Sequence, residues 1–200
     1  TDENFGVLER DVKVAEMIKK TSKDLKYPKT VFFYNDKRFT ERSRKIVGML
    51  GPMTQYGMTL ALQSENPAAL KAANRRNITS SQIDDNIKWA VENNLVATTE
   101  LIFGLPGETY ESFKNVIDRS VQRGFDSVHC NNLYLVDGIE MNRPNYIKEN
   151  NIGTHFRSVA DMAGKITVKN KENEVHDLFC AELQRVVTSS KNFTFDEYLE

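Results

Sequence analysis

The sequence predicts an α/β fold built from alternating strands and helices. Three observations predict it: helical runs that carry an apolar stripe, short β-branched and aromatic runs typical of buried strands, and a spacing of about thirty residues between successive strands. This rhythm is typical of parallel strands joined by right-handed crossover helices. The residues leave open whether the strands form an open, doubly wound sheet or a barrel.

The first helix and strand follow a short N-terminal loop. Residues 30–34 form a β-branched and aromatic run, which predicts a strand buried on both faces. The dipeptide Tyr27-Pro28 ends the preceding helix, because a residue before proline avoids helical backbone angles. That helix is predicted from apolar residues that recur every three or four positions, namely Leu8, Val12, Ala15 and Ile18.

Capping residues mark the next elements. Thr40 is predicted to cap a helix that ends at Gly51, which a proline follows. A strand is predicted over residues 57–62. Asn66, with a proline directly behind it, predicts the N-cap of a short helix that runs to about Asn74.

Two more helices and two more strands continue the alternation. Ser81, with an acidic residue three positions later, predicts a helix start, and residues 96–103 form the next strand. Thr109 opens another helix, and Gly124 stands where a left-handed C-terminal residue is expected. Residues 126–130 are predicted to be a strand.

The rhythm ends beyond Gly138. We predict a short helix from Arg143-Pro144, an irregular polar stretch over residues 151–175 and a strand over residues 179–187. Thr194, with a glutamate three residues later, forms a capping-box pair and predicts one more helix.

The composition is that of an ordinary globular protein, with 200 residues of which 40% are hydrophobic. The 27 basic and 28 acidic residues leave a net charge of -1, so no overall field favours nucleic acid or an anionic membrane. No run approaches the roughly 18 apolar residues of a membrane span, and the N-terminus lacks the apolar stretch of a signal peptide. We therefore expect a cytoplasmic protein without nucleic-acid or membrane partners.

Residue types that bind metals show no metal-site spacing. Cys130 and Cys180 form neither a disulfide framework nor a paired ligand spacing, and Cys130 is expected to be a buried structural thiol. His129, His155 and His176 lack HxxxH or HxxE spacing and are expected to be structural. The sequence predicts no metal ligands and identifies no catalytic residue.

Candidate ligand-binding residues lie in loops that follow the strands, because such loops converge on one face of parallel α/β folds. In the loop 104–108, two glycines permit close approach of a flat ligand and the following helix start offers free amides. Two interpretations stay open for this loop. It is a cradle for a nucleotide, or it is a tight turn in which Glu108 complements the helix dipole.

Polar groups at two other strand ends add to these candidates. Glu100 lies in an apolar strand and must be solvated, paired or hydrogen-bonded, so it suits either a ribose diol or an ordinary ion pair. The Gln63 amide and the Arg75 guanidinium would suit a ligand carboxylate. The alternative for Arg75 is a solvated cation at a helix end.

In combination, these loops resemble the radical S-adenosylmethionine (SAM) superfamily. The resemblance rests on the order and placement of three groups at successive strand ends: Asp2-Glu3-Asn4-Phe5-Gly6 with Arg10-Asp11, then Gln63-Ser64 with Arg75, then the run from Glu100 to Thr109. Residues 132–150 are similar to the cobalamin-associated branch, and the resemblance fades after them.

The resemblance implies a fold and a set of site residues. The fold would be a partial TIM-like barrel, with the later four strand–helix units of a (β/α)6 core over residues 1–140 and a C-terminal extension over residues 141–200. Each part of SAM would have its own binding residues: Asp2, Glu3 and Asn4 for the methionine amino group, Gln63, Ser64 and Arg75 for its carboxylate, Glu100 for the ribose, and the backbone of Gly104, Leu105, Pro106 and Gly107 for the adenine.

The sequence departs from the superfamily pattern in one respect. The CxxxCxxC loop, whose three thiolates bind a [4Fe-4S] cluster, is absent. We therefore expect a fragment of a longer iron-sulfur enzyme that cleaves SAM to a 5′-deoxyadenosyl radical for hydrogen abstraction. The branch adds cobalamin-dependent methyl transfer or rearrangement to the reactions to consider, and the isolated chain is expected to be inactive.

The implied cofactors are SAM, a [4Fe-4S] cluster whose ligands lie outside this chain, and, in this branch, cobalamin. The implied partners are a small-molecule substrate, an electron donor such as flavodoxin or ferredoxin, and a second copy that pairs with an exposed sheet edge. Two alternatives stay open: a non-catalytic nucleotide-binding α/β module, and a structural or interaction domain whose loops are only turns. The sequence identifies neither the substrate nor the type of reaction.

Overall fold

The computed structural model describes residues 4–36, 38–54, 57–172 and 174–200, and within the last two ranges it describes only the backbone of residues 159–164, 166 and 178–182. The chain divides into two compact units. The first comprises Thr1–Ile102 and Glu111–Asn131, and the second comprises Phe103–Tyr110 and Asn132–Glu200. The domain boundary predicted at residue 140 stays a prediction, since a division into compact units does not by itself establish domains.

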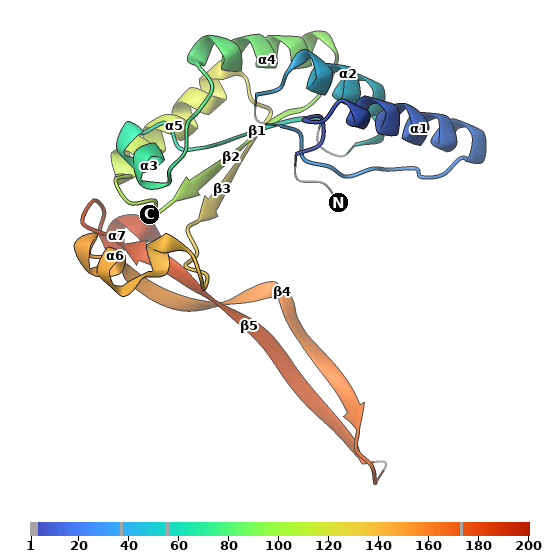
Figure 1. Cartoon of the computed structure of the whole chain (residues 1–200). Coiled ribbons are helices and arrows are strands. Elements are labelled where there is room, and N and C mark those ends of the chain that lie inside the picture. The colour runs from blue at the N-terminus through green and yellow to red at the C-terminus, as the bar shows by residue number, and fades with distance from the viewer. Residues whose placement is uncertain (1–3, 37, 55–56, 173) are drawn as a thin grey trace. The chain divides into compact units, whose positions relative to one another are not determined.

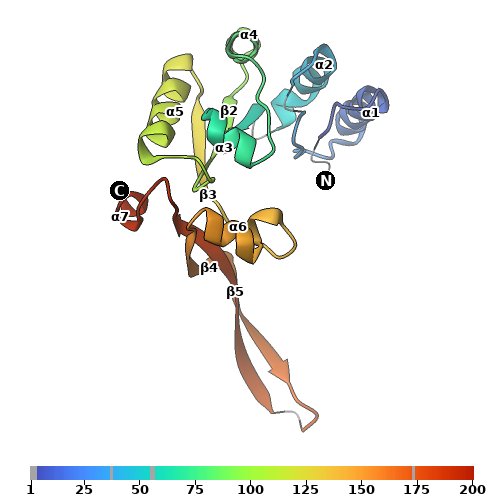
Figure 2. The same ribbon diagram turned by 60° about the vertical axis from the view of Figure 1, so that its left-hand side comes forward.

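The first unit is an α/β structure, as the sequence predicts. Its strands form one sheet, and Figure 2 shows helices α1, α2, α4 and α5 in an arc around these strands. The elements are α1 (Arg10–Leu25), α2 (Glu41–Leu50), η1 (Gly51–Met53), β1 (Met58–Gln63), α3 (Pro67–Ala72), α4 (Ser80–Glu92), β2 (Ala97–Phe103), α5 (Tyr110–Arg123) and β3 (Ser127–Asn132).

The sheet has the strand order β1-β2-β3 and is open in the part of the chain that the structure describes. Strands β1 and β2 are parallel, with Met58 opposite Ala97 at one end and Gln63 opposite Leu101 at the other. The β1 side chains that face the helices, Met58, Leu60 and Leu62, are fully buried. This face supplies much of the apolar core that stabilises the unit.

The predicted strand over residues 30–34 is wrong as a regular element. In the described part of the chain, the backbone of this segment pairs with its neighbours through two isolated parallel bridges, Val31 with Thr54 and Phe5 with Asn35. The physical reason lies in the side chain of Asn35, which donates to the carbonyl of Thr59 at 2.8 Å and accepts from its amide at 3.0 Å. This carboxamide occupies positions on β1 that the backbone of a neighbouring strand would otherwise fill.

Most helix starts agree with the capping signals in the sequence. Thr40 accepts a hydrogen bond from the amide of Ser43, and Asn66 accepts one from the amide of Ala68. The predicted start of α4 at Ser81 is wrong, because Thr79 caps this helix in a capping box with Gln82. A Thr two residues before the serine competes for the same role, and its hydroxyl reaches the third helical amide.

Both glycine and proline signals at other helix ends are confirmed. Gly124 has a φ of 91° after α5, the left-handed conformation expected of a helix C-terminal residue. Helix α6 (Pro144–Glu149) has its proline at the first helical position, behind Arg143.

The second unit contains a long antiparallel hairpin, β4 (Gly153–Lys169) and β5 (Val175–Ser189), which Figure 1 shows as an extended two-stranded ribbon. The irregular stretch predicted over residues 151–175 is therefore wrong. The described side chains of this ribbon are exposed along much of its length, so no alternation of apolar and polar residues marks the strand in the sequence. The unit also contains η2 (Glu140–Asn142), α6 and α7 (Phe195–Leu199).

The capping box predicted at Thr194 and Glu197 is present at the start of α7. Among the residues that the structure describes, no helix has the length and apolar character needed to cross a membrane.

Candidate functional site

A cavity of about 390 Å³ in the first unit brings together residues that are distant in the sequence. Four of the residues predicted for the SAM site line this cavity, although they come from an N-terminal loop, the end of β1, the segment after α3 and the middle of β2. The lining residues are Asn4, Tyr34, Asn35, Thr59, Ala61, Gln63, Arg75 and Glu100.

The pleat of the sheet explains why β1 contributes three of these residues. Thr59, Ala61 and Gln63 occupy alternate positions, so their side chains project from the face opposite the one that packs on the helices. This second face carries small and polar side chains. Glu100 of the neighbouring strand β2 projects into the same cavity, since Thr98, two residues before it, lies opposite Thr59 in the ladder.

Gln63 has a backbone conformation that is uncommon for its residue type. Its φ is 67°, and the β1–β2 register shifts between Leu60 and Gln63. A residue with a Cβ in this left-handed region costs about 1–3 kcal/mol and persists at sites where the surrounding structure requires it. Gln63 is also 7% exposed. A glycine would adopt this backbone conformation at a lower free-energy cost, but it would lack the amide side chain that Gln63 contributes to the cavity.

The charged groups of the cavity have no partner among the described residues. The side chains of Glu100 and Arg75 form no hydrogen bond or ion pair with any other residue in the described ranges, and they do not pair with each other. The buried side chain of Gln63 has no such partner there either. Charged and amide groups that converge on a cavity without partners suit a ligand that supplies the missing partners.

Asn35 is a residue of the cavity that sequence reasoning missed. It lines the cavity and also holds the edge of β1 through its two hydrogen bonds to the backbone of Thr59. Its neighbour Tyr34 lines the cavity as well. The only sequence signal was that Tyr34 is the last residue of the predicted strand and that Asn35 follows it directly.

Other residues predicted for the site are placed differently. Asp2 and Glu3 lie outside the described residues. Ser64 is fully buried but does not line the cavity, because its hydroxyl accepts a hydrogen bond from the amide of Asn66 and its carbonyl accepts one from Asn77. Ser64 thus holds the turn that follows β1.

The glycine-rich loop has the predicted local conformation. Gly104 and Gly107 have φ values of 95° and 90°, which suit glycine. The loop belongs to the second compact unit, with Leu105 and Pro106 buried. The Gly107 amide donates to Oδ1 of Asn192 at 3.1 Å, so a protein acceptor already occupies it. A role of this loop in binding adenine stays a prediction.

No group of three or more His, Cys, Asp or Glu side chains that could hold a metal ion occurs among the described residues. The expectation that Cys130 is buried is wrong: its side chain is exposed on β3, the last strand of the sheet. Neighbouring atoms still shield the thiol in part, and this desolvation raises the pKa of Cys130 above its ordinary value.

The histidines have ordinary structural surroundings. His129 shares a hydrogen bond with Ser127, and His155 shares one of 2.8 Å with Thr188. His176 lies on the exposed hairpin beside Glu174. None of them lines the cavity described above.

Two curated proteins are similar to this chain in sequence. The cobalamin-dependent radical SAM methyltransferase TokK of Streptomyces tokunonensis is 27% identical over 155 residues, which are 76% of this chain and 23% of TokK. The ribosomal protein uS12 methylthiotransferase RimO of Crocosphaera subtropica is 40% identical over 75 residues, which are 36% of this chain and 16% of RimO. The chain thus spans about a quarter or less of the length of these relatives. No protein-family model matches it.

Solved structures share the fold at low sequence identity. The radical SAM methyltransferase TsrM from Kitasatospora setae, solved with cobalamin and a [4Fe-4S] cluster, superposes with a TM-score of 0.53 at 17% identity over 68% of this chain and 25% of TsrM. The structure of TsrM with tryptophan and a SAM analogue superposes with a TM-score of 0.56 at 16% identity over 80% of this chain and 32% of TsrM. The chain is thus similar in sequence to radical SAM enzymes, one of them a cobalamin-dependent methyltransferase, and similar in fold to another.

Proposed function

We propose that this chain binds SAM in the cavity of the first unit and is part of a radical SAM enzyme that transfers a methyl group. The observation that carries the proposal is the convergence of Gln63, Arg75 and Glu100 on one cavity, each without a protein partner in the described ranges. An amino acid joined to a nucleoside presents a carboxylate at one end and a ribose diol at the other. The three side chains match these groups chemically.

Each end of the ligand would have its own residues. The Arg75 guanidinium and the Gln63 amide donate hydrogen bonds to the methionine carboxylate, and charge assistance makes the contact with Arg75 the stronger one. Glu100 accepts hydrogen bonds from the two ribose hydroxyls. Asn4 lines the same cavity and would accept a hydrogen bond from the methionine amino group. These contacts orient the sulfonium and exclude water from it.

The iron-sulfur cluster of the superfamily does not fit the residues of this chain. The sequence contains two cysteines, and the described residues offer no cluster of metal-binding side chains. We propose that residues outside positions 1–200 of a longer protein bind the cluster, and that the isolated chain binds SAM without cleaving it. None of the described residues bears on cobalamin, which enters this proposal from the names of the relatives alone.

The proposed fold of the longer protein is a (β/α)6 barrel, of which this chain forms the later part. A parallel bridge pairs Phe5 with Asn35, the side chain of Asn35 bonds the backbone of Thr59 on β1, and β2 and β3 follow β1 in its sheet. Two extended segments and the three strands of the sheet thus succeed one another. We propose that β3 is an edge that pairs with another chain or with an absent strand, so the isolated chain sediments as a dimer.

Calorimetric titration of the purified chain with SAM tests the proposed site. We expect Glu100→Gln and Arg75→Gln each to weaken SAM binding by at least about tenfold, since each removes a charge-assisted contact worth about 1.5–3 kcal/mol. The matched controls are Glu92→Gln and Arg76→Gln, which alter side chains that do not line the cavity. These controls should leave the dissociation constant unchanged.

Titrations with adenosine and with methionine, the two halves of SAM, test which residues bind which half. Adenosine binding should depend on Glu100 and not on Arg75, and methionine binding should show the reverse. If SAM does not bind but ATP does, the alternative of a non-catalytic nucleotide-binding module is correct. If no nucleotide binds, the loops are only turns and the proposal fails.

A further inference from the structure

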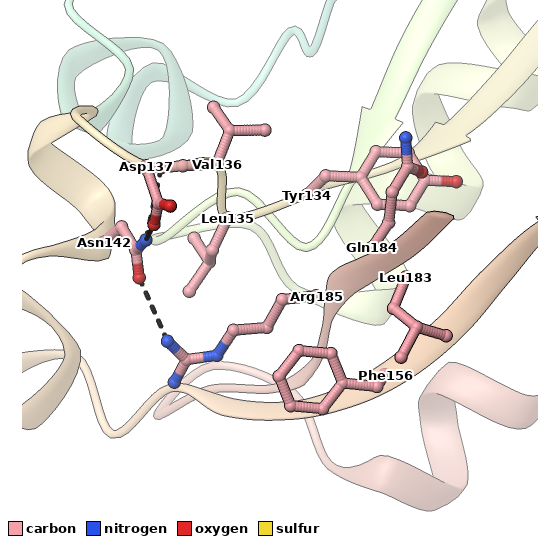
Figure 3. Close-up of a pocket in the computed structure, with 9 residues that line it drawn as sticks. All are labelled: Tyr134, Leu135, Val136, Asp137, Asn142, Phe156, Leu183, Gln184 and Arg185. Atoms are coloured by element: carbon pink, nitrogen blue, oxygen red, sulfur yellow. Dashed lines mark hydrogen bonds between the residues drawn. The ribbon is translucent and has the colours of Figure 1, made fainter. Parts of the chain in front are cut away.

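A second cavity, of about 410 Å³, lies within the second unit (Figure 3). It is built from the chain that follows β3, from a residue of η2 and from the base of the β4–β5 hairpin. Its lining combines one cationic group with several large apolar side chains. The lining residues are Tyr134, Leu135, Val136, Asp137, Asn142, Phe156, Leu183, Gln184 and Arg185.

Arg185 of β5 is held in a fixed orientation by neutral oxygen atoms. Its Nε donates to Oγ1 of Thr154 at 2.9 Å, and its Nη1 donates to Oδ1 of Asn142 at 3.0 Å. Asn142 is itself oriented, because its Nδ2 donates to the carbonyl of Val136 and to a carboxylate oxygen of Asp137. Figure 3 shows this chain of contacts from Asp137 through Asn142 to Arg185.

This guanidinium has no carboxylate partner among the described residues. No Asp or Glu oxygen lies within 4.0 Å of it there, and its Nη2 donates to no residue of the described ranges. The side chain is nevertheless half-buried. A partly desolvated arginine that two neutral acceptors hold in place is preorganised to bind an anion through its remaining donors.

The walls beside Arg185 are apolar and open to solvent. Phe156 is 71% exposed and Leu183 is 62% exposed, and both lie on the hairpin next to the hollow. Val136 is also exposed, on the opposite wall. Large exposed hydrophobic side chains grouped around a cationic group are typical of a binding site for an amphipathic anion.

We propose that this cavity binds a small organic carboxylate with an aromatic or aliphatic body. The carboxylate contacts Arg185, and the body covers Phe156 and Leu183. A monoanion fits better than a phosphate, because Arg185 is the only basic residue among the described residues of the lining and the carboxylate of Asp137 would repel a dianion. Binding of this ligand does not depend on the proposed function. Its assignment as the substrate of the methyl transfer rests on the proposed function.

The test is binding of indole-3-propionate and of its neutral amide to the 200-residue chain, measured by nuclear magnetic resonance titration. The acid should bind at least tenfold more tightly than the amide, since only the acid can pair with the guanidinium. Equal affinity of the two compounds, or no binding of the acid at millimolar concentration, would overturn the inference. This comparison uses the unchanged chain and needs no variant to fold.

Two variants locate the contact. Arg185→Gln should reduce the affinity for the acid to that for the amide, whereas Arg157→Gln, an exposed arginine of the same hairpin that does not line the cavity, should leave it unchanged. An Arg185→Gln chain that retains the preference for the acid would place the site elsewhere. SAM titration of the same samples separates the two proposals, because Glu100 and Arg185 line different cavities.

Discussion

Thr59 lies opposite Thr98 in the parallel ladder of β1 and β2, and this register sets what the first cavity contains. Glu100, two residues after Thr98, projects from the same face of the sheet as Thr59 and Gln63, whereas the adjacent Leu101 is fully buried on the other face. A slip of one residue would exchange the two faces and bury the carboxylate against the helices. The register that buries the apolar core therefore also assembles the polar cavity.

The left-handed backbone conformation of Gln63 predicts that a substitution can preserve the stability of the chain and still weaken SAM binding. We expect Gln63→Gly to leave the melting temperature unchanged or higher, because glycine adopts a φ of 67° without strain. SAM affinity should fall, since the amide donor is lost. Differential scanning fluorimetry and calorimetric titration of the same sample measure both effects. A Gln63→Gly chain with intact SAM affinity would remove Gln63 from the proposed site.

Asn35 should contribute to the stability of the first unit. Asn35→Ala removes two hydrogen bonds to the backbone of Thr59. The amide and the carbonyl of Thr59 then lack those partners. The expected loss is about 1–3 kcal/mol of unfolding free energy. Urea denaturation followed by circular dichroism measures it. Asn115→Ala, on the exposed surface of α5, serves as the control and should change the unfolding free energy by less than about 0.5 kcal/mol.

The N-terminus of α4 allows a test of which residue caps it. Thr79→Ala should destabilise the chain by about 1 kcal/mol, because it removes the side-chain acceptor of the capping box with Gln82. Ser81→Ala should cost less than about 0.5 kcal/mol, since its exposed hydroxyl contacts only Thr79 in the described structure. Chemical denaturation of the two variants measures both values. The reverse order would mean that the serine caps the helix.

The raised pKa of Cys130 predicts slow alkylation. A raised pKa means that less of the thiol is ionised at any pH below it, and the thiolate is the reactive form. In a Cys180→Ser background, where Cys130 is the only cysteine, iodoacetamide should react more slowly at pH 8 than with the same chain unfolded in urea. The rate should rise with pH and level off above the shifted pKa. Equal rates for the folded and unfolded chains would contradict the shift.

The sequence by itself determined the features that depend on a few neighbouring residues. Thr40, Asn66 and Thr194 cap helices as predicted, because a capping hydrogen bond spans only two or three residues. The α/β class also followed from local periodicity. Where two local signals competed, as Thr79 and Ser81 do before α4, the prediction missed by two residues.

Only the tertiary structure decided the features that depend on distant partners. The segment 30–34 has the residues of a strand, yet the Asn35 side chain takes its place on β1, and the polar run after Gly153 is extended because β5 pairs with it. The sequence predicted several residues of the first cavity. Strand register decides that Gln63 and Glu100 lie together there, whereas Ser64 lies in a turn. Such contacts join residues tens of positions apart, and no local pattern encodes the geometry between them.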